Sequence, residues 1–141
     1  MKKVYNNNDF FKSIIKDLEK GDKVSFLVKG NSMLPFLIDG KTEVFLERKC
    51  QLKRYDICLF QYNDKFVLHR LIGVKKDKFI YRGDNSYGLE YVSKDDIYAC
   101  VYQYITNGKT IKTNKICYKL KVRCFMAYKG LKRVVRKILK R

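Results

Sequence analysis

Residues 57–82 read ICLFQYNDKFVLHRLIGVKKDKFIYR, and this stretch decides the fold. Three runs in it are rich in apolar residues. The runs predict strands at Ile57–Gln61, Lys65–Val74 and Lys78–Arg82. Between the runs lie Asn63-Asp64 and Lys76-Asp77, and such pairs favour the tight turns of β-hairpins. The stretch therefore predicts three consecutive strands joined by short turns.

More strands are expected on both sides of this stretch. Val24, Phe26 and Val28 alternate with other residues, which predicts a strand that runs into the turn Gly30–Pro35. Further strands are predicted around Val44 and Leu46, at Ile97–Ile105, and around Ile111 after the turn Asn107-Gly108. Short strands separated by turns predict a mainly β body, partly barrel-like, with mixed or antiparallel pairing.

A helix is expected at each end of the chain. Apolar residues recur at helical spacing from Phe10 to Leu18, and Gly21 follows as a stop signal. Near the C-terminus a second apolar stripe consists of Leu131, Val134, Val135, Ile138 and Leu139. Lysine and arginine fill the rest of that segment, which predicts a basic amphipathic helix. We therefore expect a helical lead-in at 1–22, a β domain at 23–115 and a helical tail at 116–141.

The charge of the chain is strongly positive and uneven. The 141 residues include 32 Lys and Arg against 14 Asp and Glu, a net charge of +18. No acidic residue follows Asp96. A field of this sign attracts nucleic acid, anionic lipid or acidic peptides. Scattered surface lysines need no partner, so the basic C-terminal segment is the more informative part.

The cysteine pattern and the hydropathy indicate a cellular location. The five cysteines form no C-x-x-C pair and the chain has one histidine, which argues against a disulfide framework and a zinc site. We expect no metal and no cofactor. The N-terminus lacks an apolar signal region, and no stretch approaches the roughly 20 apolar residues of a membrane span. We therefore expect a cytoplasmic protein, or one held peripherally at the inner face of the membrane.

Three short segments carry the parts of a serine nucleophile. Ser32 lies in Gly-Asn-Ser-Met-Leu-Pro, where Gly30 leaves room for a substrate, Met33 and Pro35 support the turn, and the N–H of Ser32 is a natural oxyanion donor. His69 is the natural base for the Ser32 hydroxyl. Asp84, between Gly83 and Asn85, is expected to orient the imidazole of His69.

Together these segments resemble the serine-peptidase superfamily of type I signal peptidases and self-cleaving SOS-type repressors. Gly-Asn-Ser-Met-Leu-Pro is similar to the nucleophile box, and Gly83-Asp84-Asn85 is similar to the Gly-Asp-Asn box. Leu68-His69-Arg70-Leu71 resembles the histidine box of the endoplasmic-reticulum and archaeal branch. The resemblance implies a serine endopeptidase with Ser32 as nucleophile, His69 as general base and Asp84 as support, acting on a peptide or preprotein that lies extended against a strand edge. The short body and the absence of a predicted membrane anchor favour a cytoplasmic role, such as the trimming of a leader from a small peptide.

Two questions stay open at the level of the sequence. The rival to a peptidase is a non-catalytic β module whose basic tail binds nucleic acid or a membrane surface. No helix-turn-helix or RNA-binding motif is evident, which argues against nucleic acid. The C-terminal helix is expected either to bind an anionic membrane surface or to dock on the body or on a partner protein. We favour the membrane surface. The oligomeric state has no signature in the sequence.

Overall fold

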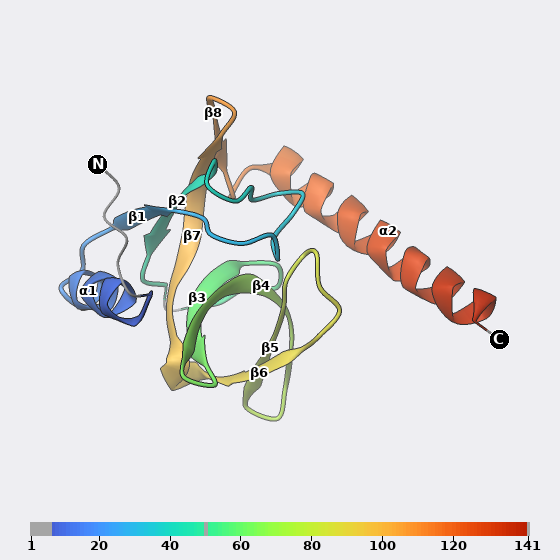
Figure 1. Ribbon diagram of the computed structural model, residues 1–141, viewed down its shortest axis with the longest axis horizontal. Helices are drawn as coiled ribbons and strands as arrows, with labels where there is room; N and C mark the ends of the chain where they lie inside the picture. The colour runs from blue at the N-terminus through green and yellow to red at the C-terminus, as the bar shows by residue number, and fades with distance from the viewer. Residues whose placement is uncertain (1–6, 50, 141) are drawn as a thin grey trace.

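The structure is a computed structural model that describes residues 7–49 and 51–140. Residues 1–6, Cys50 and Arg141, which the sequence-based expectations include, lie outside the described residues. The chain forms, in order, α1 (Asn7–Glu19), β1 (Val24–Leu27), β2 (Glu43–Glu47), β3 (Ile57–Tyr62), β4 (Lys65–Lys75), β5 (Lys78–Arg82), β6 (Glu90–Ser93), a 3-10 turn (Lys94–Asp96), β7 (Ile97–Thr106), β8 (Lys109–Lys112) and α2 (Ile116–Leu139). The expectation of a mainly β body between a short N-terminal helix and a long C-terminal helix is confirmed (Figure 1).

The eight strands form one antiparallel sheet in the order β1-β2-β7-β3-β4-β5-β6, and β8 pairs with β7. β7 is the central strand because one of its edges pairs with β2, while the other pairs with β3 near its start and with β8 near its end. β1 and β6 are the two ends of this path, so the sheet is open and not closed into a barrel. Both end strands matter for the site, because the loop after β1 meets the loop before β6.

The stretch that decides the fold forms two hairpins, β3–β4 and β4–β5. Tyr62 pairs with Lys65 across the first turn, and Lys75 pairs with Lys78 across the second. The two central residues of each turn have positive φ, between 46° and 62°. Positive φ at both positions characterises the type I′ turn, whose twist matches that of the flanking strands. This register also fixes His69 opposite Cys58 in the middle of the sheet.

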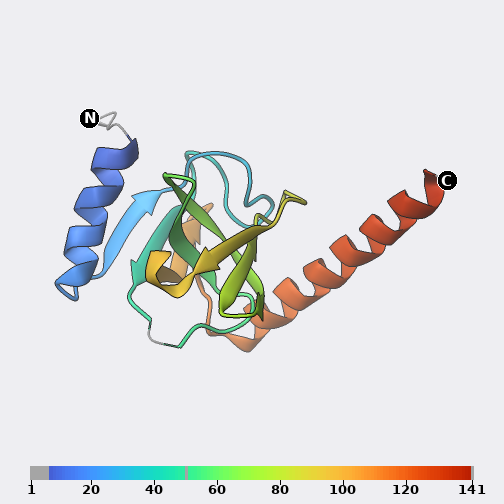
Figure 2. The same cartoon turned by 90° about the horizontal axis from the view of Figure 1, so that it is seen from below.

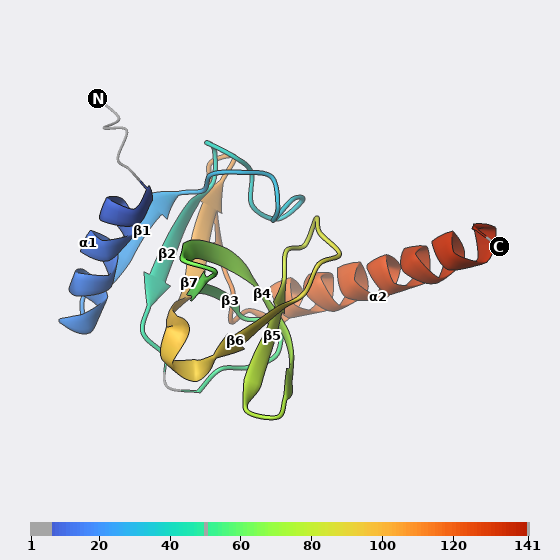
Figure 3. The ribbon, with the colours of Figure 1, turned by 60° about the horizontal axis from the view of Figure 1, so that its bottom comes forward.

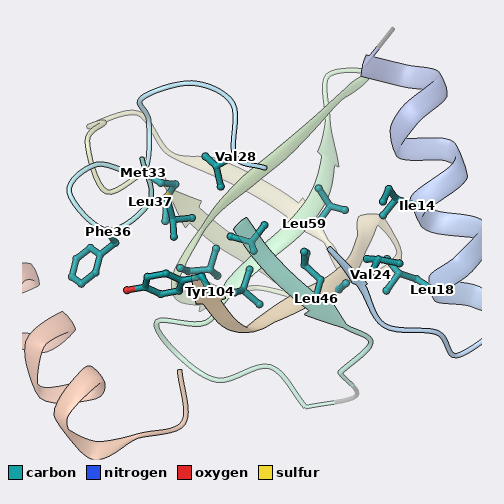
Figure 4. Close-up of a cluster of buried hydrophobic side chains, with 14 of the residues drawn as sticks. Ile14, Leu18, Val24, Val28, Met33, Phe36, Leu37, Leu46, Leu59 and Tyr104 are labelled. Carbon is teal, nitrogen blue, oxygen red and sulfur yellow. The ribbon is translucent and has the colours of Figure 1, made fainter. Parts of the chain in front are cut away.

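A hydrophobic core holds the loop that carries Ser32 against the sheet. Ile14 and Leu18 of α1 pack at one end of this core (Figure 4). Met33, Phe36 and Leu37 follow Ser32 directly and are buried at the other end. These three side chains lie within five residues and explain why the loop has a defined conformation. Exposing any of them to water would lose the favourable free energy of burying apolar surface.

The two helices lie at opposite ends of the sheet. α1 lies beside β1, whereas α2 starts beside the sheet and runs away from it (Figures 2 and 3). Tyr118 and Val122, in the first half of α2, are buried in the core. No helix in residues 7–49 and 51–140 combines the length and the hydropathy that crossing a membrane requires.

Candidate active site

The turn after β1 presents Ser32 at the surface of the protein. Gly30 has a φ of +89°, a left-handed conformation that favours glycine, and its N–H donates to Asp39 Oδ1 at 2.8 Å. The peptide bond between Leu34 and Pro35 is cis. Of the two neighbouring loop residues, Met33 is buried in the protein and Pro35 is exposed to solvent. Ser32 itself is half-buried.

His69 lies within hydrogen-bonding distance of Ser32. The Nε2 atom of His69 is 3.1 Å from Ser32 Oγ, and its Nδ1 atom is 2.7 Å from Glu90 Oε1. An ionised carboxylate can only accept hydrogen bonds, so Nδ1 carries the proton and donates a hydrogen bond to Glu90. In the neutral imidazole Nε2 is then the acceptor for the Ser32 hydroxyl. The expected pairing of Ser32 with His69 is therefore present in the geometry.

The carboxylate that contacts His69 Nδ1 belongs to Glu90. The prediction that Asp84 orients His69 is therefore wrong. Glu90 is the first residue of β6, where it pairs with Tyr81 of β5. About 15% of the Glu90 side chain is exposed, and Oε2 is buried without a hydrogen-bond partner among the described residues. Two consecutive contacts thus connect the Ser32 hydroxyl to the His69 imidazole and the imidazole to the Glu90 carboxylate. Glu90 takes the place that Asp84 was expected to take.

Asp84 binds Arg70 instead. The guanidinium donates from Nε to Oδ1 at 2.9 Å and from Nη2 to Oδ2 at 2.8 Å, and neither side chain has any exposed surface. Nη1 of Arg70 also donates to the Tyr55 carbonyl and the Tyr118 hydroxyl. Burial lowers the pKa of Arg70, but its partners outweigh that and the pKa lies above its ordinary value. The guanidinium stays charged, so this is a fully buried ion pair.

Strand geometry explains why Asp84 cannot serve His69. Successive side chains of a strand point to opposite faces, and His69 and Arg70 are successive residues of β4. The carboxylate that pairs with Arg70 therefore lies on the other face from the imidazole. A fully buried arginine needs a carboxylate partner, and Asp84 is that partner for Arg70.

The loop between β5 and β6 closes the site from the other side. The Asn85 N–H donates to the Ser32 carbonyl at 2.8 Å, and the Asn85 side chain donates to the Asn31 carbonyl. A Cβ on Gly83 would lie 2.7 Å from the Ser32 carbonyl oxygen and 3.0 Å from His69 Nε2. Only glycine fits there without displacing the backbone of Ser32. Gly83 and Asn85 thus support the loop, as expected.

Lys129 of α2 joins the helix to this loop. Its ammonium donates to the carbonyls of Gly83 at 3.1 Å, of Asp84 at 2.8 Å and of Ser86. The side chain is buried, with an exposed fraction of 6%. The sequence analysis missed this residue among many lysines. The signal was its helical spacing from Tyr118, Val122 and Phe125, which all face the body.

The pKa of Lys129 is lowered from 10.5 to about 8, because burial and, to a smaller extent, the charge of Arg82 lower it, while Asp84 opposes the shift. Below pH 8 the folded and unfolded chains both hold this proton. Between about pH 8 and 10.5 the unfolded chain binds more protons here, so folding gains stability as pH rises. We expect the free energy of unfolding of wild type to rise with pH relative to that of Lys129→Met over this window. Urea denaturation of both proteins at several pH values measures this difference, and a difference that falls with pH contradicts it.

Two cavities lie away from Ser32. One, of about 610 Å³, is lined by residues of α1, β7 and the segment before β3, and the other, of about 360 Å³, lies between the start of β3 and α2. Neither is lined by Ser32, His69 or Glu90. In the part of the chain that the structure describes, no three His, Cys, Asp or Glu side chains gather as a metal site would require.

The sequence matches no protein-family model, and no curated protein matches it either. The geometry of Ser32, His69 and Glu90 and the resemblance of the three segments are therefore the observations that bear on function.

Proposed function

We propose that the protein is a serine endopeptidase with Ser32 as nucleophile, His69 as general base and Glu90 as the carboxylate that orients His69. The observation that carries this proposal is the chain of contacts from Ser32 Oγ to Nε2 and from Nδ1 to Glu90. A serine hydroxyl is a weak nucleophile alone, and this arrangement supplies both the base and the group that fixes its tautomer.

The proposed reaction is acyl transfer in two halves. Ser32 Oγ attacks the substrate carbonyl while its proton moves to Nε2 of His69, and the negative charge of Glu90 stabilises the imidazolium. The proton then passes to the leaving amine as the C–N bond breaks, which leaves an ester on Ser32. Water hydrolyses this ester with His69 again as base. The Ser32 N–H has no acceptor among the described residues, so it is free to stabilise the oxyanion.

An extended peptide fits the surroundings of Ser32 better than a small molecule does. The two cavities described above are not lined by Ser32, His69 or Glu90, whereas the two end strands of the sheet, β1 and β6, both lead into the site. An end strand offers unpaired backbone groups to which a peptide can add as a further strand. Leu27, Leu89 and Tyr91 on or next to these strands are exposed and provide apolar contacts for its side chains.

The resemblance to the signal-peptidase-like superfamily narrows the proposed substrate to a peptide or leader segment. It supports Ser32, His69 and the loop residues Gly83 and Asn85, which correspond to its three boxes. One departure concerns Gly30, since many signal peptidases have an oxyanion-donating serine two residues before the nucleophile. The Gly30 N–H is occupied by Asp39, so the oxyanion would depend on backbone donors nearer to Ser32.

Incubation with a mixed peptide library, read by mass spectrometry, tests the proposed activity. Wild type is expected to cut a subset of peptides internally, and Ser32→Ala and His69→Ala are expected to cut none above background. Thr110→Ala, an exposed hydroxyl on β8, serves as the matched control and should cut like wild type. Absence of cleavage by folded wild type, or equal cleavage by Ser32→Ala, would count against a serine peptidase.

A further inference from the structure

One face of α2 is buried against the body, and the opposite face is exposed to solvent. Tyr118, Val122 and Lys129 are buried against the body. A second row lies about two positions away from these residues, which is about half a turn, and therefore faces away from the body. This row consists of Ile116, Leu120, Tyr128, Leu131, Val134, Val135 and Ile138, and every one of these side chains is exposed. The apolar row thus runs the length of the helix and extends the stripe seen in the sequence.

The second half of α2 has no other element packed along it. In three views it projects from the sheet, and the loop before β6 is the last part of the body beside it (Figures 1–3). The exposed fractions are 65% for Leu131, 53% for Val134 and 64% for Ile138. An apolar row of this length on a single helix is more than scattered surface residues provide. The row is therefore a surface for a partner.

The charges around this row identify the partner. The 24 residues of α2 include eight Lys and Arg and no acidic residue. Helical geometry places Lys121 and Lys132 along one flank of the apolar row, and Arg123 and Lys137 along the other. Long basic side chains on both flanks reach lipid phosphates while the apolar row enters the acyl boundary. Anionic lipid satisfies both features at once.

A second copy of the helix fits less well. The spacing from Leu131 to Val134 and Ile138 is compatible with a helix pair. In such a pair, however, the basic flanks of one copy would face basic flanks of the other, with no acidic residue in α2 to compensate. We infer that α2 binds the surface of an anionic lipid bilayer, lying in the interface with its apolar row toward the lipid and the body on the opposite side. This inference does not depend on the proposed peptidase activity.

Co-sedimentation of the purified protein with lipid vesicles tests this surface. We expect binding to phosphatidylcholine vesicles that contain phosphatidylglycerol, a fall in binding with added salt, and little binding to phosphatidylcholine alone. Val134→Ser with Ile138→Ser removes apolar contact and leaves the charge unchanged. This double variant should bind at least about tenfold more weakly. Ser32→Ala should bind like wild type.

Leu27→Ser with Val74→Ser is the matched control, because both residues are exposed on the sheet, away from α2. It should bind vesicles like wild type. The two residues changed in α2 are exposed, so circular dichroism should show unchanged folding. Equal binding by the α2 double variant, or equal binding to neutral vesicles, would overturn the inference. So would a dimer in sedimentation velocity, lost in the double variant, from a protein that does not bind vesicles.

Discussion

Glu90→Gln is expected to lower kcat of peptide cleavage by about a thousandfold to ten-thousandfold. The carboxylate accepts a hydrogen bond from the Nδ1–H of His69 at 2.7 Å, which leaves Nε2 free to accept a hydrogen bond from Ser32. Glutamine has the same shape but no charge to stabilise the imidazolium. Its amide nitrogen can also donate to Nδ1, which would put the proton on Nε2 and block the base. Steady-state kinetics on a peptide that wild type cleaves measures the effect.

The control for this change is Glu47→Gln. Glu47 lies on β2 and forms an exposed ion pair with Lys23, so the same chemical change there should leave kcat within about twofold of wild type. Stability of Glu90→Gln should be close to that of wild type, since the side chain keeps its volume and its neighbours. A Glu90→Gln enzyme with wild-type kcat would remove Glu90 from the proposed mechanism.

Asp84→Asn is expected to reduce the free energy of unfolding by about 3–5 kcal/mol. The change leaves the Arg70 guanidinium charged and fully buried, with a neutral amide in place of two charge-assisted hydrogen bonds. The loss arises from a buried charge without compensation and not from the loss of a catalytic group. Chemical denaturation followed by circular dichroism measures it.

A double variant separates the ion pair from the rest of the site. Arg70→Met with Asp84→Leu removes both charges together, and buried ion pairs replaced by apolar side chains often keep their stability. We expect the double variant to regain part of the stability that Asp84→Asn loses, because it also removes the hydrogen bonds from Arg70 to the Tyr55 carbonyl and the Tyr118 hydroxyl. A loss below about 1 kcal/mol in Asp84→Asn would show that the pair is not buried as described.

The sequence predicted the hairpins well because the information for them is local. The turn after β3 contains Asn63-Asp64 and the turn after β4 contains Lys76-Asp77, and each strand contains residues that favour strands. β6 was not predicted as a strand, because its pairing with β5 depends on how the loop from Gly83 returns to the sheet. Local composition has no signal for that return.

The site was predicted in part for the same reason. Ser32 and His69 each lie in a segment whose own residues indicate chemistry, and the structure brings them together. The third member depends on register: Glu90 reaches His69 because β6 pairs with β5 opposite Tyr81. Asp84 follows β5 closely and was the nearer candidate in sequence, yet Arg70 binds it on the other face of β4. A contact between distant segments decided the assignment in both cases.

The central claim is that His69 activates Ser32, and labelling with a fluorophosphonate tests it most directly. Attack by Ser32 Oγ would form an O–P bond and release fluoride while His69 takes the hydroxyl proton. Trypsin releases residues 30–41, in which Ser32 is the one hydroxyl side chain, so mass spectrometry can locate the adduct. The account predicts an adduct on this peptide in wild type, at a rate at least about a hundredfold above that of His69→Ala. An adduct that forms elsewhere, or at the same rate in His69→Ala, would contradict it.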